Sequence, residues 1–330
     1  MRMAIVRTLS FSLAAIAIPI FGFSMDIGET DHRALCGGRP YKRISVPNGA
    51  SPYVELAADG MTGPFLLDYG ATRSSLSAGA FRGPEGSMRR ATISLPGVEK
   101  ADFHLSRYDF LLQPGKGQLG VIGDDLLSRL TVQLTESTAF LSAEPCRTEA
   151  LMARGLTPVA QDGFFSSDAS KVHAGLPNVP VVFLRLGEMR VWAQIDTGYE
   201  DFVYSRSVDI NQALFDRLVG SGVEINRIDD IDIWTCEGRE RRSVYRVRRQ
   251  PLTIENEQGK RIAETKDFRL IVKPANTCGG IADLPEPAAQ LGASFLGLFG
   301  DAIFDPKSAT VWLGSPRGDA PGARDGGGGQ

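Results

Sequence analysis

The chain of 330 residues contains an internal repeat, and this repeat restricts the possible folds more than any other feature. One copy reads Pro-Phe-Leu-Leu-Asp68-Tyr-Gly-Ala-Thr, and the other reads Val191-Trp-Ala-Gln-Ile-Asp196-Thr-Gly-Tyr. A second pair of similar segments follows, Val121-Ile-Gly-Asp-Asp-Leu-Leu in the first copy and Gln290-Leu-Gly-Ala-Ser-Phe-Leu in the second. The same elements therefore occur twice in the same order, which predicts two lobes of similar topology.

The two copies differ in the number of residues between the aspartate and the later glycine. Asp68 and Gly123 are 55 positions apart, whereas Asp196 and Gly292 are 96 positions apart. The second copy therefore carries an insertion of about 41 residues.

These patterns suggest a division of the chain into six segments. Polar or mixed segments lie between and around the two copies. The end of the chain is rich in Gly, Pro, Arg and Asp and has no apolar period, and this composition predicts disorder. The segments are a signal peptide at 1–24, an N-terminal segment at 25–40, lobe 1 at 41–147, a linker at 148–176, lobe 2 with its insertion at 177–315, and a disordered tail at 316–330.

Strand signals dominate both copies. Short runs of β-branched or aromatic residues are bounded by Pro, Asn and Gly, as is typical of strands. Examples are 90–95, 179–186, 191–195 and 252–255. A helix is expected around Asp209–Val219, where apolar residues recur at helical spacing, and a short one at Glu149–Arg154. The chain is therefore predicted to be mainly β.

The N-terminus resembles an export signal. Arg2 and Arg7 precede an almost wholly apolar run from Leu9 to Phe23, and Ser24 precedes a candidate cleavage point. This order of basic, apolar and small residues is typical of a removable signal peptide. An uncleaved membrane anchor is the alternative. We expect an exported protein, periplasmic or secreted, with no membrane contact beyond the signal.

Charge and composition exclude two classes of partner. The chain has 36 basic and 39 acidic side chains, whereas nucleic-acid binders usually carry a basic excess. Beyond the N-terminus, no apolar stretch approaches the ~20 residues that span a bilayer. Neither a nucleic-acid partner nor a polytopic membrane protein is expected, and the oligomeric state is open.

The cysteines and histidines argue against a metal site. The four cysteines form no CxxC pair, and the three histidines have no spacing that places two on one face of an element. In an exported protein an even, widely spaced set favours disulfides, with three possible connectivities. Because Cys36 and Cys146 bracket the first copy, we predict the pairs Cys36–Cys146 and Cys236–Cys278. We expect no cofactor and no metal.

The repeated aspartate is the main candidate for chemistry. In each copy an apolar strand ends in Asp-x-Gly, so a carboxylate leaves a rigid strand and enters a tight turn. A single Asp-x-Gly is a common β-turn. Its occurrence at equivalent positions of both copies points to a shared site. The structural alternative, in which these turns are unrelated, predicts that Asp68 and Asp196 lie far apart.

At these residues the sequence resembles the retropepsin-like and pepsin-like aspartic proteases. Asp196-Thr197-Gly198 is the Asp-Thr-Gly signature of that family, and the segments containing Gly123 and Gly292 resemble its later apolar-apolar-Gly element, with Gln290 as a polar substitute. The resemblance covers roughly residues 41 to 315. It implies two pseudo-symmetric acid-protease lobes in one mainly β chain.

The resemblance also implies a mechanism. Asp68 and Asp196 would be the catalytic pair, supported by Tyr69, Gly70, Thr197, Gly198, Gly123 and Gly292. Two carboxylates about 3 Å apart do not both ionise, so one activates a water and the other polarises the peptide carbonyl. The implied activity is that of an endopeptidase acting on extended peptides or unfolded proteins. The Pro96-Gly97 hairpin is a candidate flap over the cleft, with an ordinary surface turn as the alternative.

Tyr69 departs from the family pattern. The family has Thr or Ser at this position, where a small hydroxyl makes a hydrogen bond that joins the two loops. Tyr is much larger and needs a rearranged surrounding. The site has either adapted, or the pairing is broken and the protein binds peptides without cutting them. The arginine-rich stretch Arg239–Arg249 is expected to be a solvated hairpin within the insertion.

Overall fold

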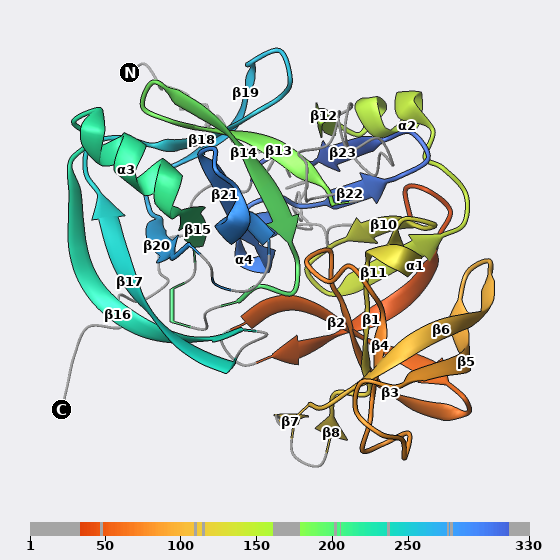
Figure 1. Cartoon of the computed structure of the whole chain (residues 1–330). Coiled ribbons are helices and arrows are strands. Elements are labelled where there is room, and N and C mark those ends of the chain that lie inside the picture. Colours follow the sequence, from red (N-terminus) through yellow and green to blue (C-terminus); the bar gives the residue numbers. More distant parts are fainter. Residues whose placement is uncertain are drawn as a thin grey trace, which may run out of the picture. The chain divides into compact units, whose positions relative to one another are not determined.

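Two large β-sheets make up most of the structure, a computed structural model (Figure 1). It describes the residue ranges 34–46, 49–108, 111–113, 116–160, 179–200, 203–204, 206–235, 238–275, 277 and 280–316. All of them belong to one unit, Ala34–Gln330. The mainly β class predicted from the sequence is confirmed.

Several predicted features lie outside the described residues. They are the signal peptide at 1–24, most of the segment 25–40, the linker beyond Ala160, the tail beyond Pro316, and both Cys236 and Cys278. Among the residues that the structure does describe, no helix has the length and apolar character needed to cross a membrane.

The first sheet has 12 strands and combines strands from both copies of the repeat. Its strand order is β12-β23-β22-β10-β11-β1-β2-β3-β9-β4-β6-β5. The bounds are β1 (Arg39–Val46), β2 (Gly49–Ala58), β3 (Met61–Leu67), β4 (Ser75–Ser77), β5 (Met88–Leu95), β6 (Val98–Ser106), β9 (Gly120–Ile122), β10 (Thr131–Leu134), β11 (Thr138–Ser142), β12 (Thr157–Ala160), β22 (Ala302–Asp305) and β23 (Thr310–Leu313). The pairing of β10 with β22 joins the two copies through backbone hydrogen bonds.

The second sheet has 9 strands, all from the second copy. Its order is β16-β17-β20-β15-β21-β14-β13-β18-β19. The bounds are β13 (Val181–Leu186), β14 (Met189–Asp196), β15 (Ser207–Asn211), β16 (Ile225–Thr235), β17 (Gly238–Val247), β18 (Leu252–Glu255), β19 (Arg261–Thr265), β20 (Arg269–Lys273) and β21 (Ala288–Gly292).

Helices are few and short in the described chain. They are α1 (Asp124–Leu127), α2 (Thr148–Ala153), α3 (Gln212–Gly220), α4 (Ala293–Leu296) and a 3-10 helix, Gly280–Asp283. A separate pair of short strands is formed by β7 (Leu111–Gln113) and β8 (Lys116–Gly117). The predicted helix at 209–219 begins three residues later than expected, because 207–211 forms β15 and Asn211 caps α3 by accepting a hydrogen bond from the Leu214 N–H.

Four strands of each copy follow one pairing pattern. In the first copy β3 is parallel to β9, β9 is antiparallel to β4, and β4 is parallel to β6. In the second copy β14 is parallel to β21, β21 is antiparallel to β15, and β15 is parallel to β20. Each aspartate is thus presented at the end of a strand whose parallel neighbour carries the later glycine segment.

The insertion of the second copy lies between β15 and β20. Only β5 separates the corresponding strands β4 and β6, whereas α3 and β16 to β19 separate β15 and β20. The long hairpin of β16 and β17 runs along the edge of the second sheet, beside β20 (Figure 1).

A tight turn sets the register of the strand that leads to Asp68. β2 and β3 are joined by Asp59 and Gly60, which have φ values of 46° and 79°. Both positive φ angles fit a two-residue hairpin turn, for which Asp-Gly is a favoured sequence. The hairpin places the buried residues Pro64–Leu67 against β2 and β9.

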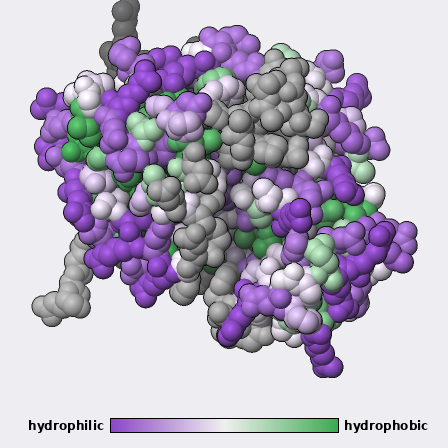
Figure 2. Space-filling model, viewed as in Figure 1, coloured by the Kyte–Doolittle hydropathy of each residue, from purple (hydrophilic) through white to green (hydrophobic). Residues whose placement is uncertain are grey.

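The apolar side chains of both copies lie mainly in the interior. The face in Figure 2 is largely hydrophilic, with hydrophobic residues in small separate groups. Large exposed apolar side chains in the described chain are scattered, such as Met88 on β5 and Val219 on α3. The apolar runs that indicate strands in the sequence therefore supply most of the buried side chains.

Part of the predicted linker is built into the first sheet. Within 148–160 the structure has the expected short helix, as α2, and the strand β12, which pairs with β23. Leu151 and Leu156 are buried against Ile303 and Trp312. This stretch of mixed composition therefore contains a strand at the edge of the first sheet. The partner of this strand, β23, is about 150 residues away in the chain.

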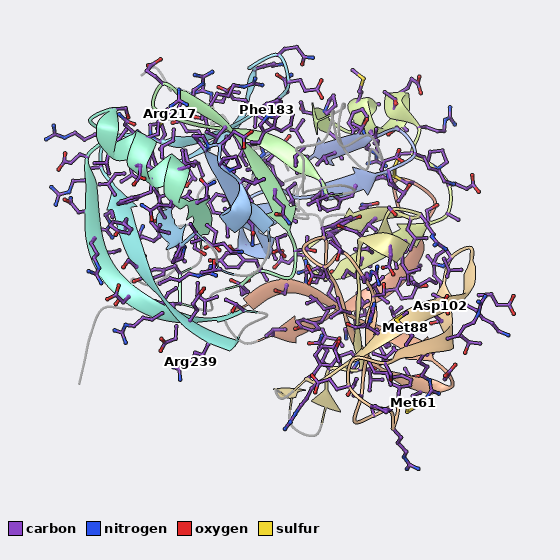
Figure 3. The ribbon with its side chains drawn as sticks, in the orientation of Figure 1. Met61, Met88, Asp102, Phe183, Arg217 and Arg239 are labelled. Atoms are coloured by element: carbon purple, nitrogen blue, oxygen red, sulfur yellow. A yellow bond between two sulfur atoms is a disulfide. The ribbon has the colours of Figure 1, made fainter. Side chains whose placement is uncertain are left out.

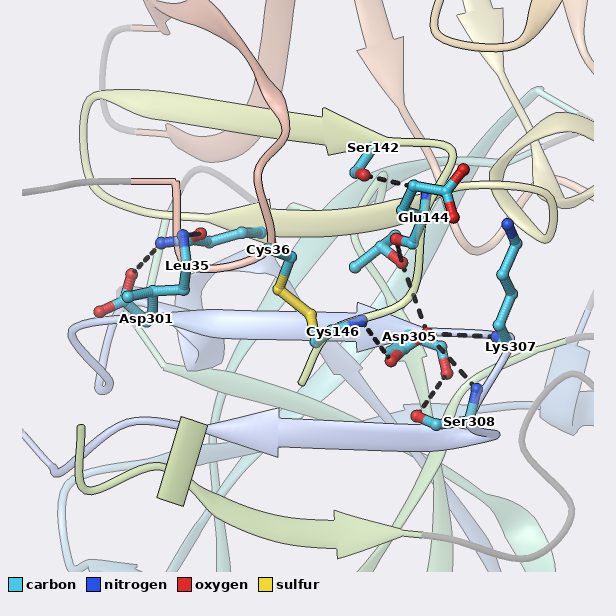
Figure 4. Close-up of a disulfide and its surroundings, with 11 residues drawn as sticks. Leu35, Cys36, Ser142, Glu144, Cys146, Asp301, Asp305, Lys307 and Ser308 are labelled. Carbon is cyan, nitrogen blue, oxygen red and sulfur yellow. Dashed lines mark hydrogen bonds between the residues drawn. A yellow bond between two sulfur atoms is a disulfide. The ribbon is translucent and has the colours of Figure 1, made fainter. Parts of the chain in front are cut away.

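A disulfide joins the two ends of the first copy. Cys36 and Cys146 are bonded, with a Cα–Cα distance of 4.7 Å and a sequence separation of 110 (Figure 4). The predicted pair is therefore present in the structure. Its surroundings link the copies, because the Cys146 N–H donates a 3.1 Å hydrogen bond to Asp305 of β22.

Candidate active site

The two repeated aspartates lie at the ends of strands whose preceding residues are buried. Asp68 directly follows β3, whose residues Gly63–Leu67 are buried, and Asp196 is the last residue of β14. In the parallel neighbours, Ile122 pairs with Leu67 and Gly292 pairs with Asp196. Each carboxyl is therefore held by a strand that is fixed on both sides.

The later glycines allow the aspartate turns to pack closely. A Cβ at Gly123 would lie 2.6 Å from the backbone oxygen of Ala71, and a Cβ at Gly292 would lie 2.6 Å from that of Tyr199. Both distances are too short for a side chain. The glycine has the same role in both copies: without a side chain, it lets the backbone of its own segment contact the backbone of the aspartate turn.

The structure brings Asp68 and Asp196 together. The Gly198 N–H donates hydrogen bonds to Asp196 Oδ1 (3.0 Å) and, across the contact, to Asp68 Oδ1 (3.1 Å). The Gly70 N–H donates to Asp68 Oδ1 (2.7 Å). A Cβ at Gly70 would lie 2.2 Å from Asp196 Cγ, and one at Gly198 would lie 2.3 Å from Asp68 Oδ2. Each glycine therefore packs directly against the aspartate of the other copy.

Thr197 joins the two loops. Its hydroxyl donates a 2.6 Å hydrogen bond to the Leu67 carbonyl and accepts a 3.0 Å bond from the Tyr69 N–H. The side chain is completely buried. One threonine thus makes two hydrogen bonds between segments that are about 130 residues apart in the chain.

Tyr69 points into a hydrophobic core that contains residues of both copies. Its side chain is completely buried, and its ring packs on Phe304 of β22 with 4.5 Å between centroids. Because the ring lies in the core, it does not occupy the contact between the aspartate loops. Tyr69 contributes to that contact through its backbone N–H, and the loops stay together without a second hydroxyl.

Burial and mutual interaction shift both carboxyls. Burial raises the pKa of Asp68, against the opposing effect of backbone hydrogen bonds and a hydrogen bond with Asp196. Burial and the charge of Asp68 raise the pKa of Asp196 well above its ordinary value. A partly buried, hydrogen-bonded pair of this kind holds one proton between its two members.

A third carboxyl lies nearby. Asp124, the first residue of α1, is 2% exposed, and burial together with the charges of Asp68 and Asp196 raises its pKa to about 10. Within the residues that the structure describes, neither of its carboxyl oxygens has a hydrogen-bond partner. Asp124 is therefore protonated at neutral pH and adds no charge to the pair.

A cavity of about 320 Å³ opens beside the pair. From the aspartate turns it is lined by Asp68, Gly70, Asp196 and Gly198, and its further walls are Gln194, Gln290, Asp209, Lys273, Ile233, Thr235 and Arg242 among others. Most of these further walls belong to the second sheet. The volume is in the range of small ligand sites.

The hairpin at this cavity differs from the predicted one. Pro96 and Gly97 are not among the cavity residues, and a Cβ at Gly97 would lie 3.1 Å from Ala143, on the side of β11. Ile233 and Thr235 of β16 and Arg242 of β17 line the cavity instead. The hairpin that borders this cavity is therefore β16–β17, which belongs to the insertion.

Arg242 is buried, contrary to the expectation for its stretch. Its exposed neighbour Arg239, near the tip of the hairpin in Figure 3, pairs with Asp232 at the surface. Arg242 is 3% exposed and pairs with Asp209 at 2.8 Å, while Tyr199 donates a 2.8 Å hydrogen bond to the other oxygen of Asp209. The interpretation as a solvated hairpin fits Arg239 and is wrong for Arg242.

Sequence reasoning missed most of the second-sheet wall. Asp209, Arg242, Lys273 and Gln194 were not singled out, although a buried Asp between Val208 and Ile210 is an unusual residue for an apolar strand. Gln290 stood out only as a polar substitute. Its Nε2 donates a 2.8 Å hydrogen bond to Asp196 Oδ2.

The described part of the chain contains no group of three or more His, Cys, Asp or Glu side chains placed to hold a metal ion. No protein-family model matches the chain, and a search of curated proteins finds no match.

Proposed function

We propose that the protein is an aspartic endopeptidase in which Asp68 and Asp196 activate a water between them. The observation that carries this proposal is the hydrogen bond from the Gly198 N–H to Asp68, together with the contact of Gly70 with Asp196. Two partly buried carboxyls at the ends of two strands, each packed against the loop of the other, form a pair that shares one proton.

The chemistry follows from this shared proton. The ionised carboxylate accepts a proton from water while the water oxygen bonds to the peptide carbonyl carbon, and the protonated carboxyl gives its proton to the carbonyl oxygen. In the second step the C–N bond breaks, the amine leaves with the proton taken from water, and the other carboxylate recovers a proton from the diol. The pair ends with one proton, as it began.

The two-lobed architecture is part of the proposal. The lobes would be residues 41–147 and 177–315, related as in the retropepsin-like and pepsin-like proteases. Support comes from the common pairing pattern of β3, β9, β4 and β6 with β14, β21, β15 and β20. An extended peptide would lie between the aspartates and the β16–β17 hairpin, where backbone hydrogen bonds hold extended chains.

Export belongs to the same proposal. A signal at 1–24 and a disulfide between Cys36 and Cys146 both fit a protein that works in an oxidising compartment. N-terminal sequencing of protein from an exporting host tests it. A chain that begins after Ser24 is expected, and an intact Met1 in a membrane fraction would contradict it.

A peptide-binding protein without catalysis is the second candidate. The observation that favours it is the hydrogen bond from Gln290 to Asp196 Oδ2, because this oxygen faces a side chain that a reacting water would have to displace or share. Such a protein would bind extended peptides in the same cavity and leave them intact.

The deciding experiment uses an unfolded polypeptide with a quenched fluorophore, incubated with the purified protein from pH 3 to pH 8. We expect cleavage by the wild type and its loss in Asp68→Asn and in Asp196→Asn, because an amide does not accept the proton. Asp102→Asn, at an exposed position of β6, is the matched control and should retain full activity. Binding without cleavage by the wild type at every pH would support the second candidate, and cleavage by the double aspartate variant would refute the proposal.

A further inference from the structure

One face of the second sheet is polar where it borders the aspartates. Gln194, Gln290 and Asp209 are cross-strand neighbours, since Gln194 pairs with Gln290 and Gln290 pairs with Asp209. In the next strand Ile271 pairs with Asp209, and Lys273 follows two residues later on the same face. All of these polar side chains are at most 6% exposed. Burying such groups costs free energy unless each of them has a hydrogen-bond or charge partner.

Most of these groups already have partners. Asp209 accepts hydrogen bonds on both carboxyl oxygens, from Tyr199 and from Arg242. Arg242 also pairs with Glu240 at 2.7 Å. Gln290 donates to Asp196. Asp209, Arg242 and Gln290 therefore all have hydrogen-bond or charge partners among the residues around the cavity.

Lys273 is the exception. Its side chain is 6% exposed and lines the same cavity as Asp68 and Asp196, yet within the described chain it makes no hydrogen bond and no ion pair at contact distance. Burial lowers the pKa of Lys273, while the charge of Asp209 acts in the opposite direction. A buried ammonium group of this kind persists where a nearby negative charge compensates it.

The charges around Lys273 indicate which group that is. Asp209 from β15 and Arg242 from β17 are bonded to each other and act on Lys273 with opposite signs. Glu240, also from β17, is partly exposed and paired with Arg242. The remaining negative charge that acts on Lys273 is Asp196, at the end of β14, and Lys273 in turn favours the ionised form of Asp196. Asp124 is protonated and adds no charge.

We propose that Lys273 is a positioning residue of the aspartate pair: its ammonium group, buried in the cavity wall, is the counter-ion that keeps one of the two carboxyls ionised. This inference rests on the proposed function for its catalytic consequence. The charge interaction itself does not depend on turnover.

The first test is the pH profile of kcat/KM. Removing the positive charge in Lys273→Met makes the first ionisation of the pair harder, so the whole profile should move to higher pH, by roughly one unit. Lys273→Arg keeps the charge and should restore the position of the profile. Lys100→Met, on the exposed surface of β6, is the control and should leave the profile unchanged. A profile that stays in place in Lys273→Met would overturn the proposal.

The second test measures stability and requires no activity. The melting temperature is followed from pH 3 to pH 9 in the wild type, Lys273→Met, Asp196→Asn and the double variant. We expect Lys273→Met to alter the pH dependence in the wild-type background and to have little effect on it in the Asp196→Asn background. An equal effect in both backgrounds would assign Lys273 to Asp209 alone and overturn the proposal. If the wild type shows this coupling but cleaves nothing, the proposed function fails and the inference about Lys273 stands.

Discussion

The hydroxyl of Thr197 donates a 2.6 Å hydrogen bond to the backbone carbonyl of Leu67, the residue that precedes Asp68. The same oxygen accepts from the N–H of Tyr69, the residue that follows it. Asp68 is therefore flanked on both sides by hydrogen bonds to a single side chain of the second copy. The orientation of one aspartate is fixed by the residue next to the other.

Replacing the Thr197 hydroxyl should lower both the stability of the protein and its cleavage activity. Thr197→Val keeps the shape but leaves the Leu67 carbonyl and the Tyr69 N–H without a partner in a buried place, at a cost of about 1–3 kcal/mol. Urea unfolding and the cleavage assay measure the two effects. Thr197→Ser should recover most of both, and Thr62→Val on an exposed part of β3 should change neither. A fully active Thr197→Val would show that the loops hold together by packing alone.

Gly198 should not tolerate a side chain. In Gly198→Ala the new Cβ would lie 2.3 Å from Asp68 Oδ2, so the two aspartates must move apart and cleavage should fall by at least about tenfold. Gly220→Ala in α3 is the matched control, because a Cβ there meets no atom within 4 Å. Equal activity in the two variants would contradict the close contact of the loops.

The ring of Tyr69 should be needed for stability. Tyr69→Phe keeps the packing on Phe304 and should stay within about 1 kcal/mol of the wild type. Tyr69→Thr would leave a cavity in the core and should lose about 3–5 kcal/mol, the range for truncating a buried aromatic. Chemical denaturation compares the two. A stable and more active Tyr69→Thr would instead support the idea that the missing cross-contact hydroxyl limits the site.

Asp124 should make stability fall as pH rises. Its pKa is about 10 in the folded protein and close to 4 when exposed in the unfolded chain. The folded state therefore holds one more proton between these values, and its contribution is complete below pH 4 and is lost progressively up to about pH 10. Asp124→Asn removes this dependence, so its melting temperature relative to wild type should rise from pH 5 to pH 8. A constant difference over this range would mean that Asp124 does not titrate as described.

Non-reducing peptide mapping should find two disulfides. Cys36–Cys146 is present in the structure, and replacing both cysteines by serine should cost about 4 kcal/mol on the chain-entropy estimate. Cys236–Cys278 stays a prediction. It is supported by the adjacent residue Thr235 and the nearby Gly280, which line the same cavity. A link between Cys146 and Cys236 would contradict both pairs.

Local patterns predicted several elements well. The β-branched run Leu252–Glu255 is β18 with the expected bounds, and the apolar segments before Asp68 and Asp196 are the buried strands β3 and β14. These predictions succeeded because a buried strand needs apolar residues whatever its partner is. The repeat placed the two aspartates at equivalent strand ends for the same reason.

Other features depend on contacts between residues far apart in the chain. The sequence of β17 is rich in arginine, which fits an exposed hairpin, yet Arg242 is buried because it forms an ion pair with Asp209 of β15. The sequence offers the Pro96–Gly97 hairpin either as a flap over the cleft or as an ordinary surface turn, and the hairpin that lines the cavity is β16–β17. The position of a hairpin depends on which other strands its own strands pair with, and β17 pairs with β20.

The sequence by itself determined the mainly β class, the two strand-end aspartates and the glycines that make close packing possible. Only the tertiary structure decided that Gly198 reaches Asp68, that Tyr69 turns into the core, and that Lys273 borders the pair. The physical reason is that strand formation follows from the polarity of neighbouring residues, whereas the charge and hydrogen bonding of a buried group depend on which distant strands pack around it.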